Sequence, residues 1–408
     1  MAQVDSLRAE NKFKKTETGN IPVDWNIVKI KDIISLDYGK GLPENKREGD
    51  RYPVYGSNGI VGYHKGYLVE GPGIIIGRKG TVGCVTWSNI DFWPIDTTYY
   101  VATNTTKINL RWLYYLLINL KLNRLNAATG IPGLNRNVVS NLAIALPPFS
   151  EQKKISEVLS TVDEAIEKSK EIIEKTKELK KGLMQKLLTR GIEHKKFKKT
   201  KIAEIPVEWK VVKLKELYKS PIRDFGSFST TKLVKYISEG IPFLRSENFK
   251  EGRLVHENIM YISEEVHRKL GKSFIKKGVL MFTKIGNIGH SDIYDGQYGE
   301  CNSNATIAKI DIDEKKAFVP YIRWILNSKI AMKQFQGRII STPPRINLGE
   351  ISKLSIPLPI YSEQEKIAEM LNKLESIIDN EEKRKNVIET LKNGLMQSLL
   401  TGKTRVKT

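Results

Sequence analysis

The sequence predicts a mixed α/β (α+β) fold that is built twice. It consists of two globular halves and two long helices, which form an antiparallel coiled coil with a pseudo-two-fold internal repeat. The segment Ile-Pro-Val-Asp-Trp at 21–25 returns as Ile-Pro-Val-Glu-Trp at 205–209. The segment Leu-Pro-x-x-Ser-Glu-Gln at 146–152 returns at 358–364. About forty helix-forming residues follow each copy of the second segment.

These repeats divide the chain into four parts. Residues 1–148 form the first globular half and 149–190 the first helix. Residues 191–360 form the second half, and 361–408 the second helix with a basic tail. The offset between the copies grows from 184 at the first segment to 212 at the second, so the second copy is longer between its shared ends. Two copies with similar ends and dissimilar central segments indicate one architecture that carries two different recognition surfaces.

Each globular half mixes short strand-like runs with helical ones. Residues 73–77, 82–87 and 279–283 are rich in β-forming side chains, whereas 110–125 and 321–335 have helical patterns. Glycine-rich loops separate these runs. The halves are therefore predicted to be α/β or α+β domains.

The two long helices have predicted starts and an apolar seam. Ser150 and Ser362 are expected to cap the helix starts, and Glu365 completes a capping box with Ser362. Forty residues make a rod of roughly 60 Å. The order globule, helix, globule, helix makes the pair antiparallel. The predicted seam consists of Ile155, Leu159, Val162, Ile166, Leu179, Leu183, Ile367, Leu371, Leu374, Ile378, Leu391 and Leu395.

Two glycines interrupt the helical patterns at equivalent positions. Gly182 and Gly394 each cost about 1 kcal/mol relative to alanine in a helix. Their matching phase suggests points of close helix approach, and frayed helix ends are the alternative.

The charge is unevenly distributed. The chain carries a net charge of +21, yet the segments 149–190 and 361–402 together sum to zero. The surplus lies on the globular halves, which points to a polyanion, with nucleic acid favoured. A basic but inert surface is the alternative. Cys84 and Cys301 are the only cysteines, and no signal-like segment is present, so a reducing, cytoplasmic location without a membrane is expected.

Several short sequence motifs resemble those of a known protein family. They are Tyr-Pro-Val-Tyr-Gly-Ser-Asn-Gly at 52–59, Gly-Arg-Lys-Gly-Thr-Val-Gly at 77–83, Ile-Pro-Phe-Leu-Arg at 241–245 and Thr-Lys-Ile-Gly-Asn-Ile-Gly at 283–289. With the repeated helix starts, nearly the whole chain is similar to the specificity (S) subunits of Type I restriction–modification systems. The resemblance implies two target recognition domains that read a bipartite double-stranded DNA site without catalysis or cofactor. It also implies a helical spacer that sets the gap and docks two methyltransferase (M) subunits, with restriction (R) subunits completing the complex.

The loops contain side chains suited to DNA. Arginine and lysine bond guanine edges or phosphates, and asparagine bonds adenine. Any one of these residues is as well explained as an ordinary solvated side chain. The candidates in the first half are Lys40, Asn45, Lys46, Arg47, Tyr55, Ser57, Asn58, His64, Lys65, Arg78, Lys79 and Arg136. Those in the second half are Arg223, Ser227, Phe228, Ser229, Thr231, Lys232, Arg245, Lys284, Asn287, His290, Thr342 and Arg345. Trp25 and Trp209, in contrast, are predicted to be core residues common to both halves.

No catalytic or metal-binding motif stands out. Leu146-Pro147-Pro148-Phe149 has the tail of the Asp/Asn-Pro-Pro-aromatic tetrad of amino-methyltransferases, but Leu146 cannot accept a hydrogen bond. The five histidines have no metal-ligand spacing. A fused restriction or modification enzyme would need motifs that are missing here. A coiled-coil protein that bridges nucleic acid without sequence preference remains the alternative function.

Overall fold

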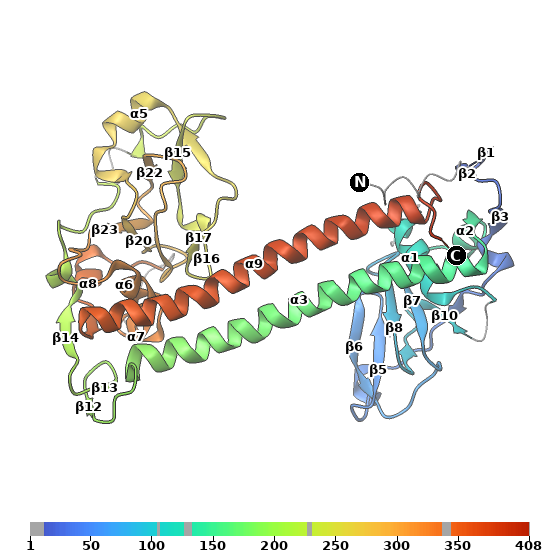
Figure 1. Ribbon diagram of the computed structural model, residues 1–408, viewed down its shortest axis with the longest axis horizontal. Coiled ribbons are helices and arrows are strands. Elements are labelled where there is room, and N and C mark those ends of the chain that lie inside the picture. The colour runs from blue at the N-terminus through green and yellow to red at the C-terminus, as the bar shows by residue number, and fades with distance from the viewer. Residues whose placement is uncertain (1–11, 104–106, 126–132, 227–230, 337–343, 408) are drawn as a thin grey trace. The chain divides into compact units, whose positions relative to one another are not determined.

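The structure is a computed structural model that describes residues 12–103, 107–125, 133–226, 231–336 and 344–407. The chain forms two compact units (Figure 1). Unit 1 contains residues 1–171 and 382–408, and unit 2 contains residues 172–381. The two long helices, α3 (Phe149–Arg190) and α9 (Tyr361–Leu399), therefore each contribute one half to each unit. This division differs from the predicted one, which placed the helices outside the globular halves.

Unit 1 combines small sheets with short helices. A four-stranded sheet has the order β4-β10-β7-β8, a three-stranded sheet the order β6-β5-β9, and α1 packs on β7 and β8. The strands are β1 (Phe13–Thr16), β2 (Gly19–Pro22), β3 (Asn26–Lys29), β4 (Asp37–Tyr38), β5 (Tyr52–Gly56), β6 (Gly59–His64), β7 (Gly73–Gly77), β8 (Val85–Ser88), β9 (Trp93–Pro94), β10 (Thr98–Ala102) and β11 (Ala143–Leu146), and the helices are α1 (Leu110–Asn119) and α2 (Arg136–Ser140).

Unit 2 repeats this plan with more strands. One sheet has the order β18-β15-β22-β19 and another β21-β20-β23, and α6 packs on β20 and β21. The strands are β12 (Phe197–Lys199), β13 (Glu204–Pro206), β14 (Lys210–Lys213), β15 (Ile241–Leu244), β16 (Phe249–Lys250), β17 (Arg253–Leu254), β18 (Met260–Ile262), β19 (Phe274–Ile275), β20 (Leu280–Thr283), β21 (Ser291–Ile293), β22 (Cys301–Ser303), β23 (Ile307–Ile310) and β24 (Ser355–Leu358). The helices are α5 (Glu264–Lys269), α6 (Val319–Leu326), α7 (Lys329–Lys333) and α8 (Leu348–Ser352).

In both units the start of the globular part is held against its end. In unit 1, β3 pairs antiparallel with β11, the strand directly before α3. In unit 2, β14 pairs antiparallel with β24, the strand directly before α9. These pairings confirm a mixed α/β fold that is built twice.

The repeated tryptophans are core residues, as predicted. Trp25 and Trp209 are buried, and each indole donates a hydrogen bond to a glutamate of the repeated Ser-Glu-Gln segment. The N–O distance is 2.9 Å from Trp25 to Glu151 and 3.1 Å from Trp209 to Glu363. The two sequence repeats are thus the two sides of a single contact.

In each unit a basic side chain also contacts the buried glutamate, an arginine in unit 1 and a histidine in unit 2. In unit 1, Arg405 lies 2.7 Å from Glu151 and also bonds both carboxylate oxygens of Asp24. The hydrogen bond from Arg405 lowers the pKa of Asp24. In unit 2, His194 lies 2.9 Å from Glu363 and 3.2 Å from Glu208. The buried glutamate is therefore satisfied from two sides in both units.

The glycine after each long helix has no room for a side chain. Gly191 and Gly402 have φ of +63° and +70°, in the left-handed region that favours glycine at a helix end. A Cβ at Gly191 would lie 2.7 Å from Trp209, and one at Gly402 would lie 2.5 Å from Pro22. The chain thus turns tightly against the tryptophan motif.

The repeated glutamine, rather than the serine, organises each helix start. Gln152 donates to the carbonyl of Pro147 and accepts from the backbone N–H of Asn109, both at 2.9 Å. Gln364 makes the same two bonds, to Pro359 and Phe318. Because α3 and α9 begin one residue before Ser150 and Ser362, the serines lie in the first turn, and their predicted capping role is wrong.

The long helices run antiparallel within each unit. In unit 1, Lys392 of α9 lies 2.6 Å from Asp163 of α3. In unit 2, Lys180 of α3 lies 3.9 Å from Glu375 of α9. The two lysines are separated by the same offset as the two Ser-Glu-Gln segments, and so are the two acids. Both units therefore have the same helix register.

Most of the predicted seam is buried or half-buried, with two exceptions. Leu179 is 52% exposed and Leu391 is 54% exposed, so the prediction fails at these repeat-equivalent positions, which face outward. Gly182 and Gly394 are exposed inside continuous helices, and a Cβ at either would meet no atom within 4 Å. They are neither close-approach points nor helix ends. The remaining seam residues are Ile155, Leu159, Val162, Ile166, Leu183, Ile367, Leu371, Leu374, Ile378 and Leu395.

We expect Arg405→Ala to lower the free energy of unfolding of unit 1 by about 2 kcal/mol, because it removes a charged partner of the buried Glu151 carboxylate. Urea unfolding of the full chain, monitored through hydrogen exchange of the amides of unit 1, measures this free energy. Lys403→Ala, an exposed change in the same tail, is the control. Equal stability of the two variants would contradict the prediction.

Candidate nucleic-acid interface

The loop after β7 brings backbone and basic side chains to one surface of unit 1. Gly77 has no space for a side chain, since a Cβ would lie 2.2 Å from the carbonyl oxygen of Thr81. Gly80 and Gly83 have φ of +78° and +74°, which allows the tight turn. Lys79 is exposed on this loop. Such a loop suits close approach of a phosphate or a base edge.

Two predicted residues from distant segments meet on one tyrosine. The guanidinium groups of Arg78 and Arg136 lie 5.3 and 5.2 Å from the ring centre of Tyr38. Tyr38 is 51% exposed and packs edge-on against the buried Tyr99. Neither a motif nor a periodicity in the sequence marks Tyr38 as a site residue. Two guanidiniums on an exposed ring form a surface that can hold phosphates and stack on bases.

Further polar candidates are exposed at the turn of the β5–β6 hairpin and in the segments on either side of it, whereas β6 itself exposes Ile60, Val61 and Tyr63. Asn58 is exposed at the turn, and Lys40, Asn45, Lys46 and Lys65 are also exposed. Other candidates serve the loop itself. Arg47 donates to the carbonyls of Leu42 and Val61, Ser57 accepts from the N–H of Thr81, and His64 accepts from the N–H of Glu48.

Tyr55 is not among these exposed candidates. It is 6% exposed and packs with Phe92 in a small core cluster, so the prediction of a DNA contact is wrong for this residue. Its neighbours Val54 and Gly56 are buried as well. The phrase in which it stands is a buried strand, and only the turn that follows reaches solvent.

In unit 2 the corresponding loop is built in the same way but carries different side chains. The N–H of Leu134 donates to the carbonyl of Arg78, and that of Ile346 donates to the carbonyl of Lys284. Lys284 therefore takes the place of Arg78. Arg345 is exposed beside this loop and forms a β-bridge with Ile285.

Lys284 is buried, contrary to prediction. It is 2% exposed, and its ammonium lies 3.1 Å from Asp224. Arg223 donates to the carbonyl of Phe274 and pairs with Asp311. Both cations are held by unit 2 itself, so they support the loop and do not present a charge to DNA.

Three further candidates of unit 2 are occupied by internal bonds. Asn287 donates to the carbonyl of Phe249 and bonds His290. The other ring nitrogen of His290 accepts from the N–H of Gly252, and burial lowers the pKa of His290. Arg245 pairs with Glu247. Thr231 and Lys232 are exposed, whereas Ser227, Phe228, Ser229 and Thr342 lie outside the described residues.

A second buried lysine lies beneath this loop. Lys309 is fully buried, and its ammonium donates to the hydroxyl of Ser303 over 2.7 Å. Burial, and next the charge of Arg223, lower the pKa of Lys309 to about 7. Asp224, Lys284 and Cys301 also face it. The arrangement is internal to unit 2.

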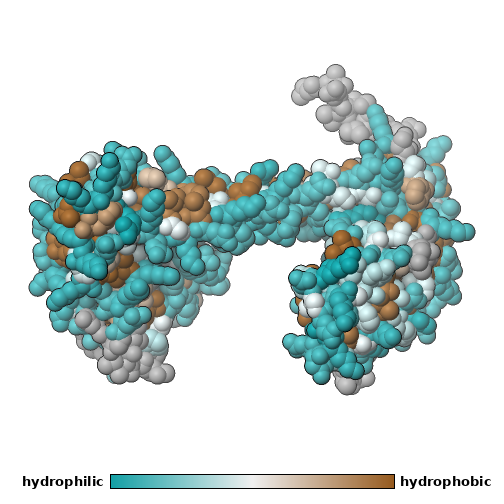
Figure 2. Space-filling view, turned by 90° about the horizontal axis from the view of Figure 1, so that it is seen from below, coloured by the Kyte–Doolittle hydropathy of each residue, from teal (hydrophilic) through white to brown (hydrophobic). Residues whose placement is uncertain are grey.

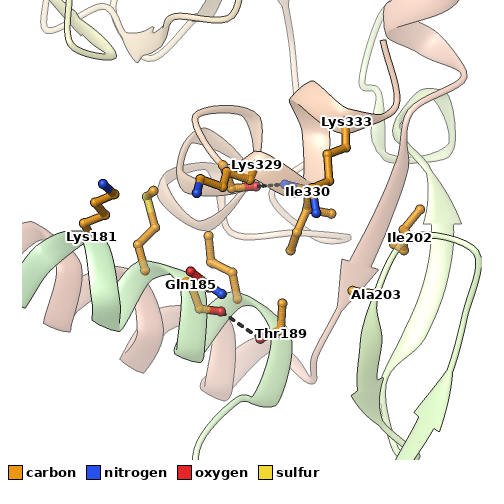
Figure 3. Close-up of a pocket in the computed structure, with 11 residues that line it drawn as sticks. Lys181, Gln185, Thr189, Ile202, Ala203, Lys329, Ile330 and Lys333 are labelled. Atoms are coloured by element: carbon orange, nitrogen blue, oxygen red, sulfur yellow. Dashed lines mark hydrogen bonds between the residues drawn. The ribbon is translucent and has the colours of Figure 1, made fainter. Parts of the chain in front are cut away.

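A pocket of about 210 Å³ lies elsewhere in unit 2, and none of the candidates lines it (Figure 3). Its apolar lining residues include Ile202, Ala203 and Ile330. Lysines stand around it on α3 and α7: Lys181, Lys329 and Lys333.

Other site types find no support in the described parts of the chain. No group of three or more histidine, cysteine or acidic side chains there is placed to hold a metal ion. No helix within those residues is long and apolar enough to cross a membrane. On the face shown in Figure 2, hydrophilic side chains cover most of the surface of each unit.

Comparison with known proteins identifies the family. Residues 22–178 and 206–390 each match the Type I restriction modification DNA specificity domain. The chain belongs to this family. The two matches cover both copies of the repeat, including the first part of each long helix.

Family members align along nearly the whole chain. The Type I restriction enzyme MjaVIII specificity subunit of Methanocaldococcus jannaschii is 29% identical over 98% of this chain and 97% of its own. The EcoBI specificity subunit of Escherichia coli is 23% identical over 95% of this chain and 81% of its own. The solved S subunit of a Type-I restriction–modification system from M. genitalium has the same fold, with a TM-score of 0.66 at 15% identity over 98% of this chain and 99% of that one.

The buried Lys309 predicts a pH dependence of stability. Between about pH 7 and pH 10.5, a lysine whose pKa in the folded protein is about 7 binds fewer protons than the same lysine in the unfolded chain. The free energy of unfolding therefore rises with pH in that window. We expect the stability of the protein relative to Lys309→Met to rise by up to about 1 kcal/mol per pH unit there. Urea unfolding at several pH values measures the difference. A pH-independent difference would refute a charge-shifted Lys309.

The Tyr38 cluster predicts a DNA contact in unit 1. We expect Arg136→Ala to weaken binding to the cognate duplex about 5- to 10-fold and to reduce the slope of log K against log salt by about 1. Fluorescence anisotropy at several salt concentrations measures both quantities. Lys153→Ala, an exposed cation of α3, is the control. An unchanged slope for Arg136→Ala would place this arginine away from DNA.

Proposed function

We propose that the chain is the non-catalytic DNA specificity subunit of a Type I restriction–modification complex and reads a bipartite target, one half-site per unit. One observation carries the proposal. Each of the two units contains the same tryptophan–glutamate contact and has the same plan, while the exposed loops of the two units differ. A shared scaffold with different loops suits the reading of two unlike half-sites.

The globular parts, residues 1–148 and 191–360, are the proposed target recognition domains. The segments 149–190 and 361–408 are the spacer, which sets the gap between half-sites and docks the methyltransferase subunits. The relatives are named as specificity subunits, which supports this assignment. The complex contains two M subunits with R subunits and acts on DNA in the cytoplasm. We assign catalysis to these partners, because the relatives of this chain are named as specificity subunits.

Methylome sequencing tests the proposal. A host that carries this gene with its neighbouring methyltransferase gene is compared with the same host after deletion of this gene alone. We expect one bipartite methylated motif to disappear, because the methyltransferase loses its means of choosing a site.

The control is the deletion strain complemented with the intact gene, in which the motif returns. An unchanged methylome in a host with an active methyltransferase would refute the specificity role.

A further inference from the structure

A polar groove of about 500 Å³ lies in unit 1, between α1, α3 and α9. Three of its lining residues are carboxylates, namely Asp163 and Glu167 of α3 and Glu389 of α9. Lys170 and Lys392 also line it. The lining thus has three carboxylates against two lysines, in contrast to the basic loops of the same unit. This lining has no excess of positive charge for DNA phosphates, so the groove is suited to another kind of partner.

The internal repeat shows what such carboxylates hold. Asp163 of unit 1 corresponds to Glu375 of unit 2, at the same offset as the two Ser-Glu-Gln segments. Glu375 binds Arg323 at 2.7 and 3.2 Å. Asp163 lies 3.3 Å from Arg111 and 2.6 Å from Lys392. At this first position both units supply their own arginine.

The second position differs between the units. Glu167 corresponds to Asp379, again at that offset. In unit 2, Arg253 donates from both terminal nitrogens to the two oxygens of Asp379. Within the part of the chain that the structure describes, the ion partner of Glu167 is Lys170, 3.3 Å away, and both side chains are more than half exposed. Such an exposed pair is weak and easily replaced.

The missing arginine has a structural cause. Arg253 stands on β17, within the segment 245–279 that separates β15 from β20. The segment between the equivalent strands β5 and β7 of unit 1 is shorter, spanning 57–72, and it completes the β5–β6 hairpin instead. The insertion that fills the position in unit 2 is therefore absent from the first copy.

The charge of the groove favours the same ligand. Glu389 corresponds to Lys177 of unit 2 at the same repeat offset. Unit 1 thus has a carboxylate where unit 2 has an ammonium, and among its described residues no arginine takes the place of Arg253. A guanidinium is the group that bonds a carboxylate with two parallel N–H donors, and a tyrosine ring, that of Tyr114, also lines the groove.

We propose that this groove of unit 1 receives an arginine side chain from a methyltransferase subunit, which bonds Glu167 and Glu389 as Arg253 bonds Asp379. The inference rests on the proposed function, in which the long helices dock these subunits. Unit 2 satisfies the equivalent position internally. The contact therefore distinguishes the two otherwise similar units.

Binding of the purified full-length chain to the purified methyltransferase subunit, measured by isothermal titration calorimetry, tests this. We expect Glu167→Gln/Glu389→Gln to raise Kd at least about tenfold, because a desolvated arginine loses its partners. Glu164→Gln, an exposed carboxylate of α3 outside the groove, is the matched control and should bind like the natural chain. Glu167→Arg should also weaken binding. When arginines of the methyltransferase subunit are changed to glutamate one at a time, the change at the arginine that enters the groove should restore binding to the Glu167→Arg chain.

The outcomes separate the two proposals. If the natural chain does not bind the methyltransferase subunit, the proposed function fails. If it binds and the double variant binds equally well, the arginine contact is refuted while the function stands. An equal loss in Glu164→Gln would also refute it, since general charge attraction would then explain the effect. Self-association that depends on Glu167 would replace the methyltransferase by a second copy of the chain and overturn the proposal.

Discussion

The hydrogen bond between a buried indole and a buried carboxylate is the contact on which both units depend. A buried carboxylate is costly unless several groups satisfy it, and Glu151 and Glu363 are each satisfied by a tryptophan and by Arg405 or His194. The contact fixes the start of each globular part against the start of a long helix. The strand pairs β3–β11 and β14–β24 close the same junction. Loop positions relative to the helices follow from this anchor.

On this common junction the two units carry different surfaces. The loop that follows β7 exposes Lys79 and places Arg78 on Tyr38, whereas the equivalent loop of unit 2 withdraws Lys284 into an ion pair with Asp224. Arg78 also donates to the carbonyl of Asp96, so the exposed Arg136 on the same ring is the cation of this cluster that is best placed for a ligand. The family's division of labour between two half-sites is thus reflected in which cations each unit leaves exposed.

The distribution of charge also separates two kinds of partner. The basic loops suit a polyanion, and the polar groove, where Glu167 and Glu389 stand beside Lys170 and Lys392, suits a cationic side chain that bonds the two glutamates. Both surfaces belong to unit 1 but are built from different elements, the loops from the sheets and the groove from α1, α3 and α9. A subunit that lends sequence choice to enzymes needs both types of surface.

The sequence by itself determined the duplication, the two long helices, the buried tryptophans and the family. Repeats and apolar periodicity are local or self-referential signals that need no knowledge of three-dimensional neighbours. The candidate site was only partly predictable. Tertiary structure decided that Lys284 and Tyr55 are buried, that Leu179 and Leu391 face outward, and that Tyr38 unites Arg78 with Arg136. The exposure and partners of a side chain depend on segments distant in the chain, and periodicity does not encode which segments those are.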